Sequence, residues 1–153
     1  MSQLPADCVN EILEYLEHDK VSLRSCLLVN HIWCEIAVRI LWRDTWNYNI
    51  SNFRTLIACL PKESQEILCE NGINISTPTS KPPMFNYASF CKVLSTYHVN
   101  FKIRQLLSSV LLQNLNDGKN IIVQEIYKLF MSQISSLKEL HYYRDDLIFK
   151  AIF

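Results

Sequence analysis

Cysteine and histidine are the side chains with the widest chemical scope in this sequence. Both bind metal ions, and the thiol of cysteine can also form a disulfide or act as a nucleophile. The 153 residues include six cysteines and four histidines. The cysteines form no Cys-x-x-Cys pair, and no histidine stands at ligand spacing from any of them. Cys8, Cys26 and Cys91 lie among apolar residues, where a free thiol acts as a small hydrophobic group. We therefore expect structural thiols, no metal site and no cofactor.

Catalytic motifs are also missing from the sequence. The histidines, at positions 18, 31, 98 and 141, accompany no nucleophile motif. The only glycines are Gly72 and Gly118, so the chain has neither a Gly-x-Ser-x-Gly elbow nor a glycine-rich phosphate loop. Thr77-Pro78 could accept a phosphate, but an exposed connector is the simpler interpretation of the proline-rich segment 76–83. The sequence predicts a protein that is not an enzyme.

The composition narrows the classes of partner. Hydrophobic residues make up 49% of the chain and charged residues 20%, which is typical of a globular domain. Lysine plus arginine equals aspartate plus glutamate at 15 each, so no basic field is available to hold a nucleic acid. No apolar run approaches the roughly 18 residues of a membrane span. The start MSQLPADC lacks the features of a signal peptide, which favours a reducing compartment, the cytoplasm or the nucleus or both.

Helical periodicity is clear in the first 43 residues. The first helix opens at Leu4-Pro5, where a proline costs no hydrogen bond. Asp19 is the expected N-cap of a second helix over about 20–29, and Asn30 that of a third helix that begins near His31. The first helix carries one apolar stripe at i, i+3, i+4 and i+7, which consists of Val9, Ile12, Leu13 and Leu16.

The third helix is apolar on two sides. The third helix also carries polar residues at intervals of four, namely Glu35, Arg39 and Arg43. This spacing predicts that the three side chains form one narrow solvated line along the helix. Burying a large apolar side chain contributes roughly 1.5–3 kcal/mol, and a unit of about 40 residues is marginal alone. We therefore expect later helices or another protein to cover the second apolar face. The first face consists of Trp33, Ile36, Ala37, Ile40 and Leu41, and the second of Ile32, Val38 and Trp42.

These segments together resemble an F-box. The matching sequence is LPADCVNEILEYL, a polar break, VSLRSCLLVNHIW and finally RILW, spread over residues 4–42. The basic residue that many members carry after the valine is replaced by Asn30-His31, which leaves the spacing intact. The positions that match the family's ordered pattern are Leu4, Pro5, Ile12, Leu16, Asp19, Leu23, Val29, Trp33, Leu41 and Trp42.

The resemblance implies a non-catalytic adaptor. An F-box docks on a Skp-type adaptor, which connects it to the cullin and RING subunits of a ubiquitin ligase, while the rest of the chain presents a protein substrate. The residues expected to bind the partner, some of which must instead be core, are Leu4, Pro5, Val9, Ile12, Leu13, Leu16, Leu28, Val29, Trp33, Leu41 and Trp42.

Further helices are expected after the F-box, which we place at 2–46. The region 47–133 is predicted to be a helical linker, with a turn-like connector at 47–53 and a stripe over 53–60 that ends at Pro61. A helix from Pro61 closes at Gly72. Helices are also expected around 87–94, over about 100–115 and around 122–130, with a turn at 116–118.

The segment 134–153 has a different pattern. Leu137 and Leu140 have the Leu-x-x-Leu spacing of a leucine-rich repeat opening, but one unit cannot cover its own core. We expect a truncated member of a family that carries a longer repeat domain. The alternative is that residues 47–153 fold back on the F-box as a closed helical domain.

Two further functional hypotheses stay open. The chain could be a plain helical interaction domain with no role in ubiquitin ligation. It could also be an F-box fragment that binds the adaptor but no substrate, and so competes with complete members.

Overall fold

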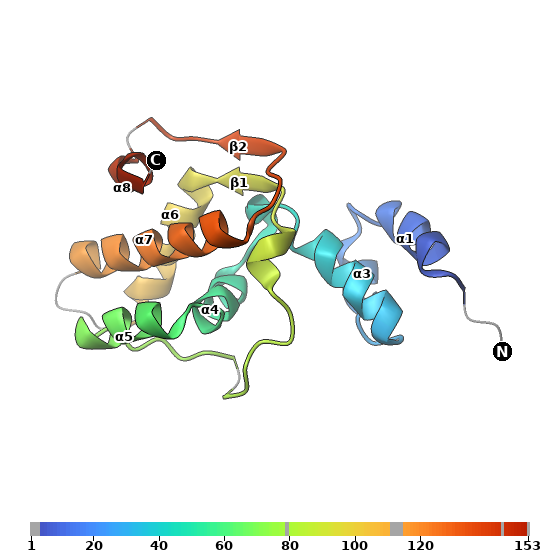
Figure 1. Cartoon of the computed structure of the whole chain (residues 1–153), viewed down its shortest axis with the longest axis horizontal. Coiled ribbons are helices and arrows are strands. Elements are labelled where there is room, and N and C mark those ends of the chain that lie inside the picture. Colours follow the sequence, from blue (N-terminus) through green and yellow to red (C-terminus); the bar gives the residue numbers. More distant parts are fainter. Residues whose placement is uncertain (1–3, 79, 111–114, 145, 153) are drawn as a thin grey trace. The chain divides into compact units, whose positions relative to one another are not determined.

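The computed structural model describes residues 4–78, 80–110, 115–144 and 146–152. It is mainly helical, which confirms the predicted fold class (Figure 1). The chain divides into two compact units, residues 1–43 and 44–153, which we term the first and the second unit.

The first unit consists of three helices, α1 (Ala6–Glu14), α2 (Lys20–Cys26) and α3 (His31–Leu41). Both predicted N-caps are confirmed. The Asp19 carboxylate accepts a hydrogen bond of 3.1 Å from the Ser22 backbone N–H. The Asn30 side chain accepts one of 3.1 Å from the Trp33 backbone N–H. These caps satisfy backbone donors that the first turn of a helix leaves unpaired. The second helix ends at Cys26, earlier than the predicted 29.

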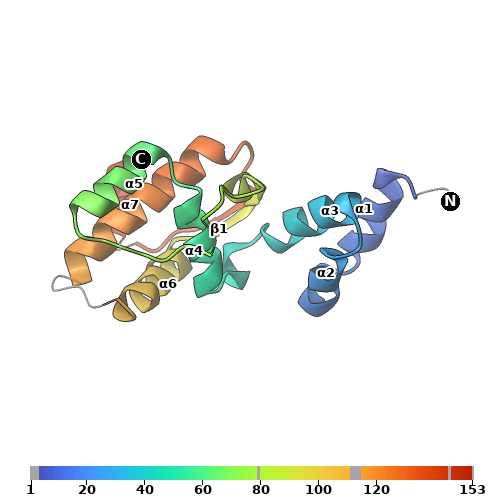
Figure 2. The ribbon, with the colours of Figure 1, turned by 90° about the horizontal axis from the view of Figure 1, so that it is seen from below.

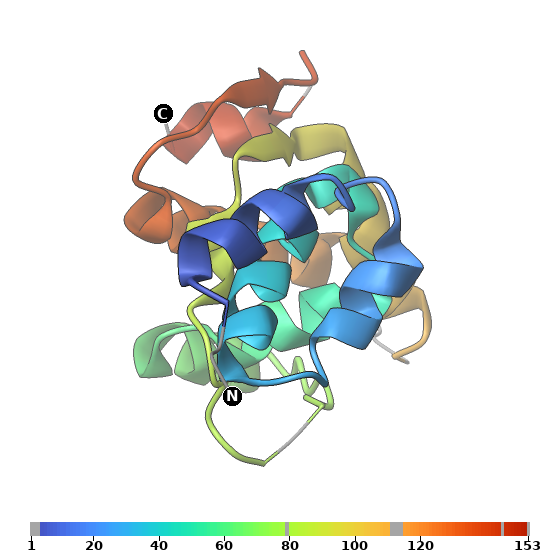
Figure 3. The ribbon, with the colours of Figure 1, turned by 90° about the vertical axis from the view of Figure 1, so that its right-hand side faces the viewer.

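Helix α3 packs against both α1 and α2 (Figures 2 and 3). The second apolar face predicted for α3 is covered, because Ile32 packs against the core of the first unit and Val38 and Trp42 are buried. The apolar side chains that stay exposed in this unit therefore lie elsewhere. Its core consists of Val9, Leu13, Leu23, Cys26, Ile36, Ala37 and Ile40.

The second unit is built around two long helices that pack on each other, α6 (Thr96–Ser108) and α7 (Leu115–Gln133). Helix α4 packs against α6, while α5 and α8 pack against α7. Pro61 precedes α5, and Gly72 follows it with a φ of +71°, so the predicted bounds of that helix are confirmed. The remaining elements are η1 (Thr45–Asn47), α4 (Ile50–Ala58), α5 (Lys62–Glu70), η2 (Tyr87–Phe90), β1 (Val93–Ser95), β2 (Glu139–His141) and α8 (Leu147–Ile152).

Two short parallel strands connect distant parts of the second unit, and the sequence did not predict them. Strand β1 pairs with β2 in the register Val93–Glu139 to Ser95–His141 (Figure 1). A single parallel bridge joins Asp44 to Val93 on the other side of β1. The Thr45 hydroxyl donates to the Val93 carbonyl over 3.2 Å and accepts from the Ser95 N–H over 2.8 Å, so η1 is fixed beside β1.

Several predicted segments of the second unit are wrong. Residues 87–94 form η2 and the start of β1 rather than one helix, and the helix expected over 100–115 spans Thr96–Ser108. The turn expected at 116–118 lies inside α7, and the connector expected at 47–53 includes the start of α4.

The leucine-rich-repeat-like unit is not confirmed. Leu140 is the central residue of β2, yet 45% of its surface is exposed, whereas a repeat leucine should be buried in the core. Strand β2 pairs with β1 rather than with a neighbouring repeat of the same kind.

Candidate protein-docking surface

The residues that the sequence singled out for partner binding fall into two groups in the structure. Val9 and Leu13 are buried in the core of the first unit, and Trp42 is also buried. Leu16, Trp33 and Leu41 are partly buried and pack against the same core. The remaining positions are exposed, and we term them the docking surface, which consists of Leu4, Pro5, Ile12, Leu28 and Val29.

The side chains of the docking surface are far more exposed than apolar side chains of their size usually are. Leu28 is 89% exposed, Val29 57%, Leu4 53% and Ile12 44%. A three-helix unit that buries its core completely, yet leaves these side chains in water, has apolar surface for a partner. The chemistry of the surface is apolar contact.

Most of the docking surface lies at one end of the first unit. Arg43, just beyond the end of α3, contacts Glu14 and Glu17 at the end of α1, so these two helices end side by side. Both helices therefore begin at the opposite end, as Figures 1 and 2 also show. Leu4 and Pro5 precede α1, while Leu28 and Val29 lie in the turn before α3. This arrangement brings the four residues to the same end.

Sequence reasoning missed three exposed residues of the first unit. Tyr15 is 91% exposed and Val21 is 73% exposed, and Cys8 is also exposed. Cys8, Ile12 and Tyr15 lie at i, i+4 and i+7, so they form a second stripe on α1 beside the buried one. That spacing was visible in the sequence and could have separated Ile12 from the core stripe.

Arg43 ties α1 to the end of α3. Its guanidinium donates to both carboxylate oxygens of Glu14, over 2.9 Å and 2.7 Å, and to Glu17 over 3.2 Å. The hydrogen bonds to Glu14 raise the pKa of Arg43 above its ordinary value, in spite of partial burial. Arg43 therefore departs from the predicted solvated line. The exposed Glu35 of that line lies 3.9 Å from His31, between its carboxylate and the Nδ1 atom.

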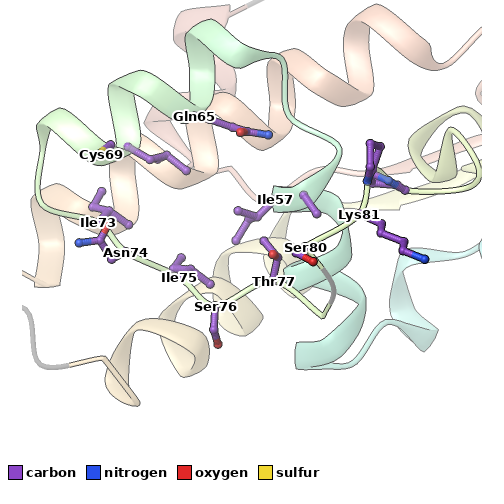
Figure 4. A pocket seen from close by; sticks show the side chains of 14 residues that line it. Ile57, Gln65, Cys69, Ile73, Asn74, Ile75, Ser76, Thr77, Ser80 and Lys81 are labelled. Atoms are coloured by element: carbon purple, nitrogen blue, oxygen red, sulfur yellow. The ribbon is translucent and has the colours of Figure 1, made fainter.

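A cavity of about 750 Å³ lies in the second unit, between α4, α5 and the chain that follows α5 (Figure 4). Ile57 of α4 and Gln65 and Cys69 of α5 line it, together with residues 73–77 and 80–83. Thr77 lies in its wall, and Arg54 donates to the Ser76 carbonyl over 3.2 Å. The described lining residues include no histidine, aspartate or glutamate.

The six cysteines are free, and the described residues contain no group of three His, Cys, Asp or Glu side chains that could hold a metal ion. None of the helices in the described ranges is both long and apolar enough to cross a membrane. Comparison of the chain with protein-family models, with curated proteins and with solved structures gave no match. The resemblance to an F-box therefore rests on the residues of this chain.

Proposed function

We propose that the first unit is an F-box that docks on a Skp-type adaptor and so connects this chain to the cullin and RING subunits of a ubiquitin ligase. The chain would contribute no catalytic group. Its action would be positional, because a substrate held by the second unit would meet the ligase at a high effective concentration.

One observation carries this proposal. The residues expected to bind the partner divide into a set that packs in the core of the three helices and an exposed apolar set that includes Leu4, Leu28 and Val29. A helical unit without a docking role would be expected to keep side chains of this size out of water. The division supports a partner with an apolar surface of its own.

A pair of matched substitutions tests the proposal. Val21 and Val29 are the same residue type, both are exposed in the first unit, and only Val29 belongs to the F-box pattern. Each is changed to aspartate in the full chain, and the affinity for a purified Skp-type adaptor is measured by titration calorimetry. Burying a valine contributes roughly 1.5–3 kcal/mol, so V29D should weaken binding by at least about tenfold.

V21D should bind within about twofold of the wild type, because an isolated exposed substitution changes little. Equal losses in V29D and V21D would contradict the proposed surface. An absence of binding by the wild-type chain would contradict the adaptor role itself, and would leave the plain helical interaction domain. A chain with both Leu4 and Pro5 changed to alanine should also lose binding.

A further inference from the structure

Exposed aromatic side chains gather at one place in the second unit. Trp46, Tyr97, Phe101, Tyr142 and Tyr143 are each 40–54% exposed. Tyr97 stacks on Phe101 with ring centroids 6.2 Å apart, and it meets Tyr143 at 5.9 Å. Large aromatic surfaces with a polar atom at one end are typical of binding sites, because they provide contact area at a small cost in conformational entropy.

Two adjoining cavities share two of these aromatic side chains. Tyr97 and Tyr143 line both of them. One cavity, of about 410 Å³, continues to Phe101 and to two cationic side chains. The other, a shallow and open one of about 470 Å³, continues to Trp46 and His141. We term the two cavities together the aromatic groove.

The cationic end of the groove consists of Arg104 on α6 and Lys119 on α7. Burial and the nearby charge of Arg104 lower the pKa of Lys119. Neither cation forms an ion pair with any carboxylate of the described residues. Two cations this close repel each other, and an anionic group between them would relieve the repulsion.

The acid at the groove, Asp146, does not neutralise these cations by direct contact. Its Oδ2 atom accepts hydrogen bonds of 2.7 Å from Asn100 and 2.7 Å from the Tyr127 hydroxyl. Its Oδ1 atom accepts one of 3.0 Å from the Phe149 N–H. The carboxylate is buried and serves to fix the segment before α8 against α6 and α7. Hydrogen bonds thus hold one wall of the groove in place, and two cations lie in the same cavity as the buried Asp146.

We propose that the aromatic groove binds an extended peptide segment of a partner protein, with an apolar or aromatic side chain in one cavity and an anionic side chain against Arg104 and Lys119 in the other. Side chains two residues apart in an extended chain point the same way and lie about 7 Å apart, which suits two cavities that share one aromatic wall. The inference that this segment belongs to a ubiquitination substrate rests on the proposed function. The binding of a peptide to the groove does not depend on the proposed function.

The test uses the full chain without any adaptor, so it is independent of docking on the first unit. Fluorescein-labelled peptides of glycine and serine carry Phe-x-Glu, Phe-x-phosphoserine or Phe-x-Gln, each also in the reverse order, and binding is followed by fluorescence anisotropy. Inorganic phosphate serves as a competitor. The variants are the double change R104Q and K119Q, and the control K62Q, since Lys62 is exposed on α5 and lines neither cavity.

At least one anionic peptide should bind at least tenfold tighter than its glutamine counterpart, and R104Q/K119Q should remove that difference while K62Q keeps it. Tyr97→Leu should weaken the anionic and the glutamine peptides alike. Equal binding of all peptides, or no binding below about 1 mM by any of them, would overturn the proposal. Competition by inorganic phosphate at the concentration of the phosphopeptide would also overturn it, because the site would then hold a small anion only.

Discussion

Replacing Arg43 with methionine tests whether the contact between the ends of α1 and α3 stabilises the first unit. Methionine keeps an unbranched apolar stem, lacks the guanidinium, and so removes three hydrogen bonds to Glu14 and Glu17. Arg39 lies one turn earlier, is exposed, and has no ion-pair partner among the described residues. R39M is therefore the matched control.

The stability that R43M is expected to lose lies between the contribution of a buried ion pair and that of a surface ion pair. Hydrogen bonds to charged groups contribute about 1.5–3 kcal/mol when buried, and exposed ion pairs contribute about 0.2–1 kcal/mol. The side chains of Arg43, Glu14 and Glu17 are 24%, 39% and 41% exposed, so water screens part of the attraction. We expect R43M to lower the free energy of unfolding of the first unit by about 1–2 kcal/mol, and R39M by less than about 0.5 kcal/mol.

Amide hydrogen exchange followed by mass spectrometry measures the stability of the first unit separately in the full chain. A loss of 1–2 kcal/mol corresponds to about 5- to 30-fold faster exchange in peptides from α1 and α3. In 1 M salt, where the Debye length is about 3 Å, the difference between R43M and the wild type should shrink. E14Q combined with R43M should cost less than the sum of the single changes. Equal exchange in R43M and R39M would refute the stabilising role of the Arg43 contact.

Three further predictions concern local interactions. Asn30→Ala removes the cap on α3 and should cost about 1 kcal/mol in urea unfolding; unchanged stability would contradict the role of the cap. Burial raises the pKa of Cys91 to about 12, from an ordinary value of 9.0, so at pH 8 iodoacetamide should label the exposed Cys69 long before Cys91. Because the folded state retains the Cys91 proton more tightly than the unfolded state, this contribution to stability should be lost as the pH rises from 9 to 12, and Cys91→Val should show a shallower decline; equal slopes would contradict it. Tyr127→Phe removes a buried hydrogen bond of 2.7 Å to Asp146 and should cost about 2 kcal/mol in thermal unfolding, whereas a loss below about 0.5 kcal/mol would contradict the importance of that bond.

Local signals were sufficient to predict where several helices begin or end. Asp19 and Asn30 set the starts of α2 and α3, and Pro61 and Gly72 set the bounds of α5, because caps, prolines and glycines act within one turn of the chain. Strand β1 has only three residues and forms through its pairing with β2. Its own sequence, Val93 to Ser95, carries no alternation long enough to distinguish it from a helix.

The candidate surfaces were predictable only in part. Periodicity placed Ile12 in the same apolar stripe as Val9 and Leu13, although Ile12 is exposed and the other two are buried. The spacing of apolar residues shows which side chains share a face of a helix, but it does not show what covers that face. The aromatic groove could not be predicted, since Trp46 and Tyr143 are brought together with Tyr97 by the parallel strands and the packing of α6.

The most direct test of the central claim is side-chain footprinting of the full chain with a photo-activated carbene, alone and mixed with a purified Skp-type adaptor. In the free chain, Leu4, Ile12, Leu28 and Val29 should be labelled, as their exposure requires. With the adaptor present, labelling of these residues should fall by at least about fivefold, while labelling of Tyr97 and Tyr143 stays unchanged. Unaltered labelling of Leu28 and Val29, or protection confined to Tyr97 and Tyr143, would contradict docking through the first unit.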